Sequence, residues 1–276
     1  MSLRETDLIP ALLTVTQKAA REVMAVYDGH MEISEKADAS PVTEADRRGE
    51  AVITAALEQL TPAIPVVGEE AVADGKRPSL DGERQFWLVD PLDGTKEFIR
   101  KGTDFTVNIG LIRDGAPCLG VVAAPARDII YWGVVGEGAW AAPLWQDGIA
   151  DGTADAARAI HTRQGHTGPL TIVASRSHRS EALEAWLAHF PDAEHVSFGS
   201  SLKLCQVASG DADLYPRLGP TCEWDTAAAD AVLRAAGGIV LAPDGAPLAY
   251  GKDTRTFLNP WFLAKGNPGL KTPALA

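Results

Sequence analysis

The spacing of apolar residues predicts a helical start to the chain and a strand-rich stretch after it. Over residues 8–26, apolar side chains recur at three- and four-residue steps, the period of a helix that packs along one face. A second helix is expected over residues 46–60, after a polar, proline-containing loop at 34–46. From residue 105 to residue 142, short apolar runs alternate with turn sequences, which is typical of an antiparallel meander.

The second half of the chain has a different pattern. Residues 145–168 are polar and glycine-rich without a sustained period, and we place a domain boundary there. From residue 170 onward, strand-length runs alternate with helical runs, and helices are expected over residues 181–190, 200–209 and 225–236. The sequence therefore predicts an α/β protein in two halves, an α+β half at 1–160 and an α/β half at 161–276.

Two short apolar runs in the first half end in acidic residues: Ile64–Val67 leads to Glu69 and Glu70, and Phe86–Val89 leads to Asp90 and Asp93. Strand ends of this kind would bring oxygen ligands to a common rim. Carboxylates packed closely repel one another, so we expect a cation between them. Magnesium is a suitable cation, because it takes a few carboxylates and keeps positions for water and phosphate.

Gly94 and Thr95 follow the second acidic pair and precede a short helical run at Lys96–Arg100. Gly94 has no Cβ to block close approach, and a helix N-terminus presents free N–H groups to an anion. Taken alone, an Asp-Gly pair is usually a turn and a Glu-Glu pair is usually solvated. Two acidic strand ends, one of them joined to Asp-Gly-Thr, indicate metal-assisted phosphate chemistry instead.

Three acidic motifs together resemble those of the inositol-monophosphatase-like family of lithium-sensitive, magnesium-dependent phosphatases. They are Gly68-Glu69-Glu70, Asp90-Pro91-Leu92-Asp93-Gly94-Thr95 and Glu223-Trp224-Asp225-Thr226-Ala227-Ala228. Their order and approximate spacing match the family, and the resemblance runs from about residue 8 to residue 264. It implies a layered α-β-α-β-α sandwich with the active site between a metal-binding first half and a second half that selects the substrate.

The resemblance also implies roles for individual residues. It assigns two or three magnesium ions to Glu69, Asp90, the carbonyl of Leu92, Asp93 and Asp225, with Asp90 as a bridging ligand. Thr95 together with Glu69 would orient and deprotonate the attacking water, and the N–H groups of Gly94 and Thr95 would hold the phosphoryl oxygens. Leu92, Asp93 and Asp225 would also line the substrate site.

Several of these positions have ordinary structural explanations as well. Asp46 stands at an expected helix start, where capping is its commonest role, although the matching acid of the family lies near the metal site. Lys36 would lie at the edge of that site, with Asp38 and Thr43 as ordinary loop or cap residues nearby. Asp225 precedes an apolar helix that it could cap while also binding metal.

Substrate choice depends on residues outside the metal motifs. Inositol monophosphatases tend to continue Asp-Gly-Thr with Thr-Asn-Phe, whereas Lys96-Glu97-Phe98 here resembles the 3'(2'),5'-bisphosphate nucleotidase branch. Two further segments suit a nucleotide with a second phosphate: Ser175-Arg176-Ser177-His178 after a strand and Gly199-Ser200-Ser201-Leu202-Lys203 at a helix start. We expect the nucleotide to be contacted by Ser175, His178, Gly199, Ser200 and Lys203. The alternative is that residues 175–178 form an ordinary helix cap, with His178 solvated and Lys203 on the surface.

The roles of two residues stay open on the sequence alone. Glu70 would either support the metal site or be exposed, and Arg217 would either contact phosphate or lie on the surface. The resemblance implies magnesium-dependent hydrolysis of adenosine 3',5'-bisphosphate to AMP and phosphate beside sulfate assimilation, with 3'-phosphoadenylyl sulfate as another substrate. The alternatives are a sister phosphatase for inositol or sugar phosphates and a non-catalytic nucleotide- or metal-binding regulator, against which the retained acids and Thr95 count.

Charge and composition narrow the expected partners. A formal net charge of −12 argues against nucleic acid or an anionic membrane surface, whereas bound metal would invert the field locally for an anionic substrate. We see no signal peptide and no run of about 18 apolar residues, so no transmembrane segment is expected. Three cysteines without metal-ligand spacing indicate reduced thiols and a cytoplasmic location, which leaves peripheral association with the inner membrane open. We expect a monomer or homodimer that acts on a small phosphorylated nucleotide.

Overall fold

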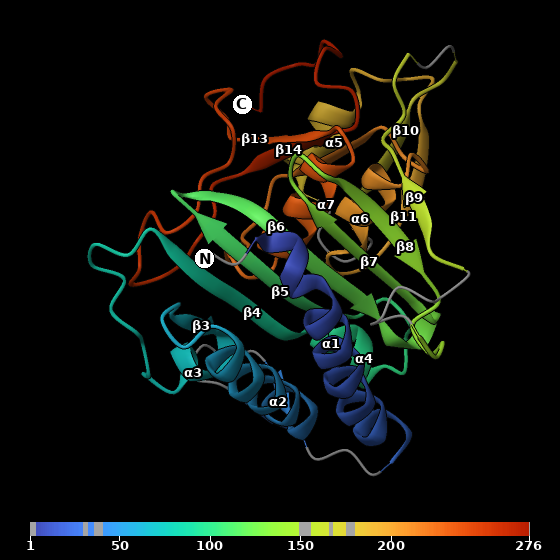
Figure 1. The fold of residues 1–276 in the computed structure, drawn as a ribbon. Coiled ribbons are helices and arrows are strands. Elements are labelled where there is room, and N and C mark those ends of the chain that lie inside the picture. Colours follow the sequence, from blue (N-terminus) through green and yellow to red (C-terminus); the bar gives the residue numbers. More distant parts are fainter. Residues whose placement is uncertain are drawn as a thin grey trace.

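A computed structural model describes residues 4–29, 33–35, 41–148, 156–165, 168–174 and 180–275. Helices and two sheets alternate in five layers, as Figure 1 shows. Helices α1 and α2 cover one face of a seven-stranded sheet, and α6 and α7 lie between its other face and a five-stranded sheet. Helix α5 packs on the outer face of the second sheet. The predicted α-β-α-β-α sandwich is therefore confirmed.

The seven-stranded sheet contains the predicted meander. In spatial order its strands are β3 (Val66–Gly68), β4 (Gln85–Asp93), β5 (Thr106–Arg113), β6 (Ala116–Ala124), β7 (Ile129–Val134), β8 (Gly138–Ala142) and β9 (Arg158–Ile160). Only β3 and β4 pair in parallel, and the other neighbours are antiparallel. Strand β9 lies inside residues 145–168, where the sequence predicted no strand, and it pairs with β8. The pattern did not reveal it because main-chain pairing at a sheet edge needs no apolar period.

Helices α1 (Glu5–Asp28) and α2 (Glu44–Leu60) form the first layer. The segment expected to be a loop before α2 contains two short paired strands, β1 (Ile33–Glu35) and β2 (Pro41–Thr43). Helix α2 begins two residues earlier than expected because Thr43 is its N-cap. Asp46 Oδ2 accepts from the Thr43 N–H at 2.7 Å, so the capping role predicted for Asp46 is confirmed.

Helix α7 (Ala227–Ala235) packs unusually close to the first sheet. An ideal Cβ at Gly120 would lie 2.0 Å from the Ala228 carbonyl oxygen, and one at Gly110 would lie 2.8 Å from the Ala228 nitrogen. At Gly133 the same atom would meet the Ala235 methyl at 2.8 Å. Glycines on three neighbouring strands and small residues on the helix therefore set the distance between these two layers.

The second sheet is mixed. Its strands in spatial order are β11 (Glu194–Ser197), β10 (Thr171–Ala174), β12 (Leu214–Arg217), β14 (Phe262–Lys265) and β13 (Ile239–Leu241). The first three are parallel, and β14 is antiparallel to both of its neighbours. Helix α5 (Glu181–Leu187) packs Leu183 and Trp186 against this sheet.

Helix α6 (Leu202–Ala208) starts later than the expected Ser200. Ser200 has φ of 46°, which lies outside the α-helical region and so excludes it from the helix. Three short helical segments complete the described fold: α3 (Glu69–Ala73), α4 (Thr95–Ile99) and η1 (Pro125–Arg127). Among the described helices none is long and apolar enough to cross a membrane. The division into halves at residue 160 stays a prediction.

Candidate active site

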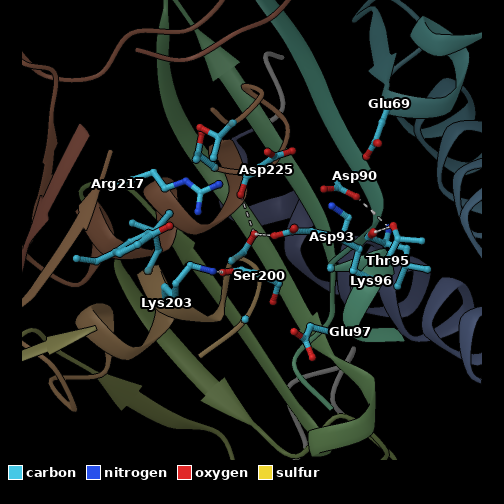
Figure 2. A pocket seen from close by; sticks show the side chains of 18 residues that line it. Glu69, Asp90, Asp93, Thr95, Lys96, Glu97, Ser200, Lys203, Arg217 and Asp225 are labelled. Atoms are coloured by element: carbon cyan, nitrogen blue, oxygen red, sulfur yellow. Dashed lines mark hydrogen bonds between the residues drawn. The ribbon is translucent and has the colours of Figure 1, made fainter. Parts of the chain in front are cut away.

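A pocket of about 330 Å³ lies at the end of β4, between the first sheet and the loops that lead into α6 and α7. Residues from both halves of the chain line it, and Figure 2 shows ten of them labelled. Most of the residues expected from the sequence line it: Glu69, Asp90, Leu92, Asp93, Gly94, Thr95, Gly199, Ser200, Lys203 and Asp225. Ser175, His178, Lys36 and Asp38 lie outside the described residues.

Three carboxylates converge at one end of this pocket. Glu69, Asp90 and Asp225 each place an oxygen within 4.8 Å of the others. The sheet explains the meeting of the first two, because β3 and β4 run in parallel with Gly68 opposite Val89, so both acids follow at the same edge. Asp225 comes from the turn before α7, more than 130 positions later in the chain than Asp90.

Electrostatics at this cluster favour a bound cation. Burial and the nearby Glu69 carboxylate raise the pKa of Asp90 well above its ordinary value. Burial, then the charges of Asp93 and Glu69, raise the pKa of Asp225 in the same way. Such shifts mean that the charged forms are disfavoured without a counter-ion. Hard carboxylate oxygens at this separation fit a divalent cation such as Mg²⁺.

Asp93 is held at the border between the two halves. Its Oδ2 lies 3.0 Å from the Ser201 hydroxyl, which is also 2.8 Å from the carbonyl oxygen of Asp225. Burial raises the pKa of Asp93, while Lys203 and the Ser201 hydroxyl act in the opposite direction. The Ser201 side chain thus joins the start of α6 to two of the expected metal ligands, a contact that the sequence did not predict.

The Thr95 side chain, which lies next to the expected metal ligands in the sequence, contacts the Asp46 carboxylate. The Thr95 hydroxyl lies 3.3 Å from Asp46 Oδ1 and 3.2 Å from the carbonyl oxygen of Leu92. Asp46 Oδ2 accepts two further hydrogen bonds, from the N–H and the hydroxyl of Thr43. Asp46 therefore caps α2 with one oxygen and contacts Thr95 with the other, so its two expected roles are compatible.

Asp225 does not cap the helix that follows it. The N-cap of α7 is Thr226, and Asp225 Oδ2 accepts from the Cys222 N–H at 2.9 Å. The expectation that Asp225 would also cap α7 was wrong, because α7 begins at Ala227 and its N-cap position is occupied by Thr226. Its carboxylate is directed by the preceding turn into the pocket (Figure 2).

Two cationic residues of the pocket, Lys203 and Arg217, lie on the opposite side from Glu69, whereas Lys96 lies beside Thr95 (Figure 2). Lys203 is buried, and its Nζ donates to the Ser200 carbonyl at 2.6 Å. Burial lowers the pKa of Lys203 to about 8, although the Asp93 charge acts against this. Arg217, which the sequence left between pocket and surface, lines the pocket and donates from Nη2 to the Pro220 carbonyl.

Two buried polar atoms on this side have no hydrogen-bond partner within the described part of the chain. They are Arg217 Nε and the Ser200 hydroxyl. Buried polar groups are nearly always satisfied in a folded protein, so each is a candidate contact for a polar ligand. The surface alternative for Lys203 is wrong, because only 6% of this residue is exposed.

Glu50 is a further residue that the sequence did not indicate. Its carboxylate accepts from the N–H groups of Glu70 at 2.8 Å and Ala71 at 2.7 Å, at the start of the helix that carries Glu69. Gly68 makes this possible, since a Cβ there would lie 2.4 Å from Glu50 Cδ. Glu70 itself is buried, so the exposed alternative for it was wrong. The only indication of Glu50 in the sequence is its position four residues after Asp46 in the same helix.

Comparison with known proteins gives one consistent result. A sequence model of the inositol monophosphatase family matches residues 5–267. The 3'(2'),5'-bisphosphate nucleotidase CysQ of Escherichia coli K12 is 42% identical over 257 residues, 92% of this chain and 98% of that protein. CysQ of Buchnera aphidicola is 35% identical and covers 93% of each chain. The crystal structure of CysQ from Bacteroides thetaiotaomicron superposes with a TM-score of 0.78 at 35% identity, over 95% of this chain and 97% of that one.

Proposed function

Because the chain belongs to the inositol monophosphatase family, we propose that it is a magnesium-dependent phosphatase that hydrolyses adenosine 3',5'-bisphosphate to AMP and phosphate. The family predicted from the three acidic motifs is confirmed. Similarity to curated bisphosphate nucleotidases along nearly the whole chain supports the nucleotide substrate. The observation that carries the proposal is a single pocket with carboxylates at one end and Lys203 and Arg217 at the other.

The carboxylate end is suited to hold two or three magnesium ions. Glu69, Asp90 and Asp225 would supply ligands to them, together with Asp93 and the Leu92 carbonyl. Bound ions neutralise phosphoryl oxygens and lower the pKa of bound water. The raised pKa values of Asp90 and Asp225 support this role. Burial and the neighbouring acids disfavour the charged carboxylates, and a bound cation would stabilise them.

Thr95 and Asp46 are suited to handle the proton of the attacking water. Thr95 Oγ would accept a proton from water while its own hydroxyl proton passes to Asp46 Oδ1, 3.3 Å away. Thr43 holds Asp46 in place with two hydrogen bonds, so the acceptor oxygen is already oriented. The water oxygen then bonds to phosphorus as the bond to the 3'-oxygen breaks. The 3'-oxygen takes up a proton from solvent and Asp46 returns its proton to solvent, which leaves AMP and phosphate. Asp46 thus takes the part that the resemblance gave to Glu69.

The cationic end is suited to the second phosphate of the nucleotide. Lys203 and Arg217 carry the charge, and the free Ser200 hydroxyl and Arg217 Nε supply donors without a described partner. Charge-assisted hydrogen bonds of this kind are roughly twice as strong as neutral ones. The same contacts would accept 3'-phosphoadenylyl sulfate, and recycling of such nucleotides in sulfate assimilation is the setting that we propose.

A phosphate-release panel tests this function. It compares adenosine 3',5'-bisphosphate, 3'-phosphoadenylyl sulfate, inositol 1-phosphate and fructose 1,6-bisphosphate, each with magnesium and with a chelator. We expect the highest kcat/KM on adenosine 3',5'-bisphosphate and no turnover with the chelator. Equal turnover of inositol 1-phosphate would assign the protein to the wider phosphatase group, and no turnover of any substrate would leave a non-catalytic binding protein.

A further inference from the structure

We propose that Asp104 is a positioning residue that holds Ser200 with its hydroxyl facing the bound nucleotide. This inference rests on the proposed function, because it concerns the same pocket. Asp104 stands two residues before β5, in the first half of the chain, whereas Ser200 precedes α6 in the second. No motif in the sequence connects the two positions.

Asp104 contacts the loop before α6 directly. Its Oδ2 accepts from the Gly199 N–H at 2.9 Å. The backbone of Asp104 is equally close, since a Cβ at Gly199 would lie 2.6 Å from the Asp104 carbonyl oxygen. The other carboxylate oxygen accepts from Arg127 Nε at 2.7 Å, and the Arg127 guanidinium lies over the Phe198 ring, 5.2 Å from its centroid. Asp104 therefore holds residues 198 and 199 in place.

The residue on the other side of Ser200 has its own anchor. Ser201 contacts the Asp93 carboxylate and the Asp225 carbonyl, both described above. Between the two anchors Ser200 has φ of 46°, a region that residues with a side chain rarely adopt. Such a conformation persists only where the surroundings impose it. The contact between Asp104 and Gly199 is one of the two contacts that impose it.

Ser200 lines the pocket, and two of its polar groups, the hydroxyl and the carbonyl, have different surroundings. Its hydroxyl is buried without a partner among the described residues, and its carbonyl accepts from Lys203 Nζ. Without the Asp104 carboxylate, Gly199 is released and Ser200 can return to a common backbone conformation. The hydroxyl and the oriented Lys203 are then lost to the nucleotide. Asp93 and Asp225 keep their contacts with Ser201, so the metal end is left intact.

The test uses the full-length protein with magnesium. We expect Asp104→Ala to raise KM for adenosine 3',5'-bisphosphate about tenfold and to change kcat by less than about twofold. Isothermal titration should show a matching loss of AMP affinity. Asp104→Asn keeps an acceptor for the Gly199 N–H and should recover most of this loss. Arg84→Ala removes an exposed ion pair with Asp114 and is the matched control, with wild-type values expected.

Two further measurements separate positioning from a structural role. The rise in melting temperature caused by magnesium should be the same in Asp104→Ala as in wild type, because the metal end is unchanged. In a double-mutant cycle, the losses caused by Asp104→Ala and Ser200→Ala should be less than additive, because both variants remove the contribution of the Ser200 hydroxyl. Additive losses, or a lost magnesium response, would overturn the proposal.

The proposed function and this inference can fail separately. An active wild type with unchanged KM and AMP affinity in Asp104→Ala overturns the positioning role alone. A wild type that neither hydrolyses the bisphosphate nor binds AMP overturns both. If Asp104→Ala does not fold, Arg127→Ala takes its place, because it removes the contact that holds the Asp104 carboxylate. A raised KM is expected for this variant, and wild-type KM would overturn the role.

Discussion

The Thr95 hydroxyl and the Asp46 carboxylate lie 3.3 Å apart, although 48 residues separate them in the chain. Thr95 begins α4 at the end of β4, and Asp46 lies in the first turn of α2. Because Asp46 is also the N3 partner in the capping box of α2, the position of this acid is fixed by the fold rather than by the pocket. The proposed proton acceptor is thereby held in position by the fold itself.

Replacement of Thr95 by alanine should lower kcat more than it changes KM. The hydroxyl is proposed to move a proton only as the transition state forms, and such groups contribute about 10²–10⁴-fold in rate. Thr95→Ser keeps the hydroxyl and is the matched variant, with at least partial activity expected. The measurement is steady-state kinetics on adenosine 3',5'-bisphosphate. A raised KM with unchanged kcat would show that Thr95 contributes to binding rather than to the chemical step.

Asp93→Asn should nearly abolish turnover and leave the protein folded. The amide keeps the contact with the Ser201 hydroxyl but removes a negative charge from the proposed metal site. Asp114→Asn is the matched control: Asp114 is a surface acid at φ of 51°, a conformation that asparagine accepts. Turnover and circular dichroism are measured for both. Near-normal turnover of folded Asp93→Asn at low magnesium would remove Asp93 from the ligand set.

Without metal the carboxylate cluster should destabilise the protein as pH rises. The pKa values of Asp90 and Asp225 are raised by burial and by neighbouring acids, so the folded state binds protons that the unfolded state has released. The free energy of unfolding contributed by these groups therefore falls as pH increases above about 4, toward their folded-state pKa values.

This is measured as melting temperature in chelator between pH 5 and pH 7.5, compared with Asp225→Asn. The variant has one acid fewer in the cluster, so its melting temperature should fall less over the same range. Magnesium at about 100 times its dissociation constant should add about 2.7 kcal/mol to the stability of the wild type at pH 7.5 and far less to the variant. Identical pH profiles for the two proteins would contradict the account.

Lys203→Ala should reduce kcat/KM on adenosine 3',5'-bisphosphate by about tenfold or more, because a hydrogen bond to a charged group is worth about 1.5–3 kcal/mol. Hydrolysis of a small phosphomonoester that cannot reach Lys203 should hardly change. His178→Ala, at the other position expected to select the nucleotide, is assayed beside it. Equal losses on both substrates would show that Lys203 supports the fold or the metal end rather than substrate choice.

Gly68→Ala should raise the magnesium concentration needed for half-maximal activity. The new methyl would collide with the Glu50 carboxylate, whose hydrogen bonds hold the backbone beside Glu69. Gly75→Ala is a control for a glycine at positive φ with open space around it. It should cost stability alone, seen in the melting temperature. Unchanged magnesium dependence in Gly68→Ala would show that Glu50 does not position Glu69.

Sequence patterns predicted that Glu69 and Asp90 lie at the acidic end of the site because both acids follow apolar strand runs, whereas Asp225 was expected from the resemblance alone. A glutamate after β3 and an aspartate on β4 must meet if the two strands are neighbours. Contacts that depend on packing of distant segments were beyond such reasoning. Arg217 looks like a surface residue in its local sequence, and nothing near Asp104 points to Gly199. The same limit applied to β9, whose partner strand was predicted but whose own pattern was too short to show a period.

The close packing of α7 on Gly110, Gly120 and Gly133 makes the two halves of this chain poor candidates for exchange with those of relatives. Asp225 stands two residues before this helix, so a methyl group at the contact is expected to move one proposed metal ligand away from Asp90. A chimaera that joins the first half of one relative to the second half of another would need matched small residues on both sides of the contact. Exchange of either half of this chain is therefore expected to depend on three glycines outside the pocket as well as on the residues that line it.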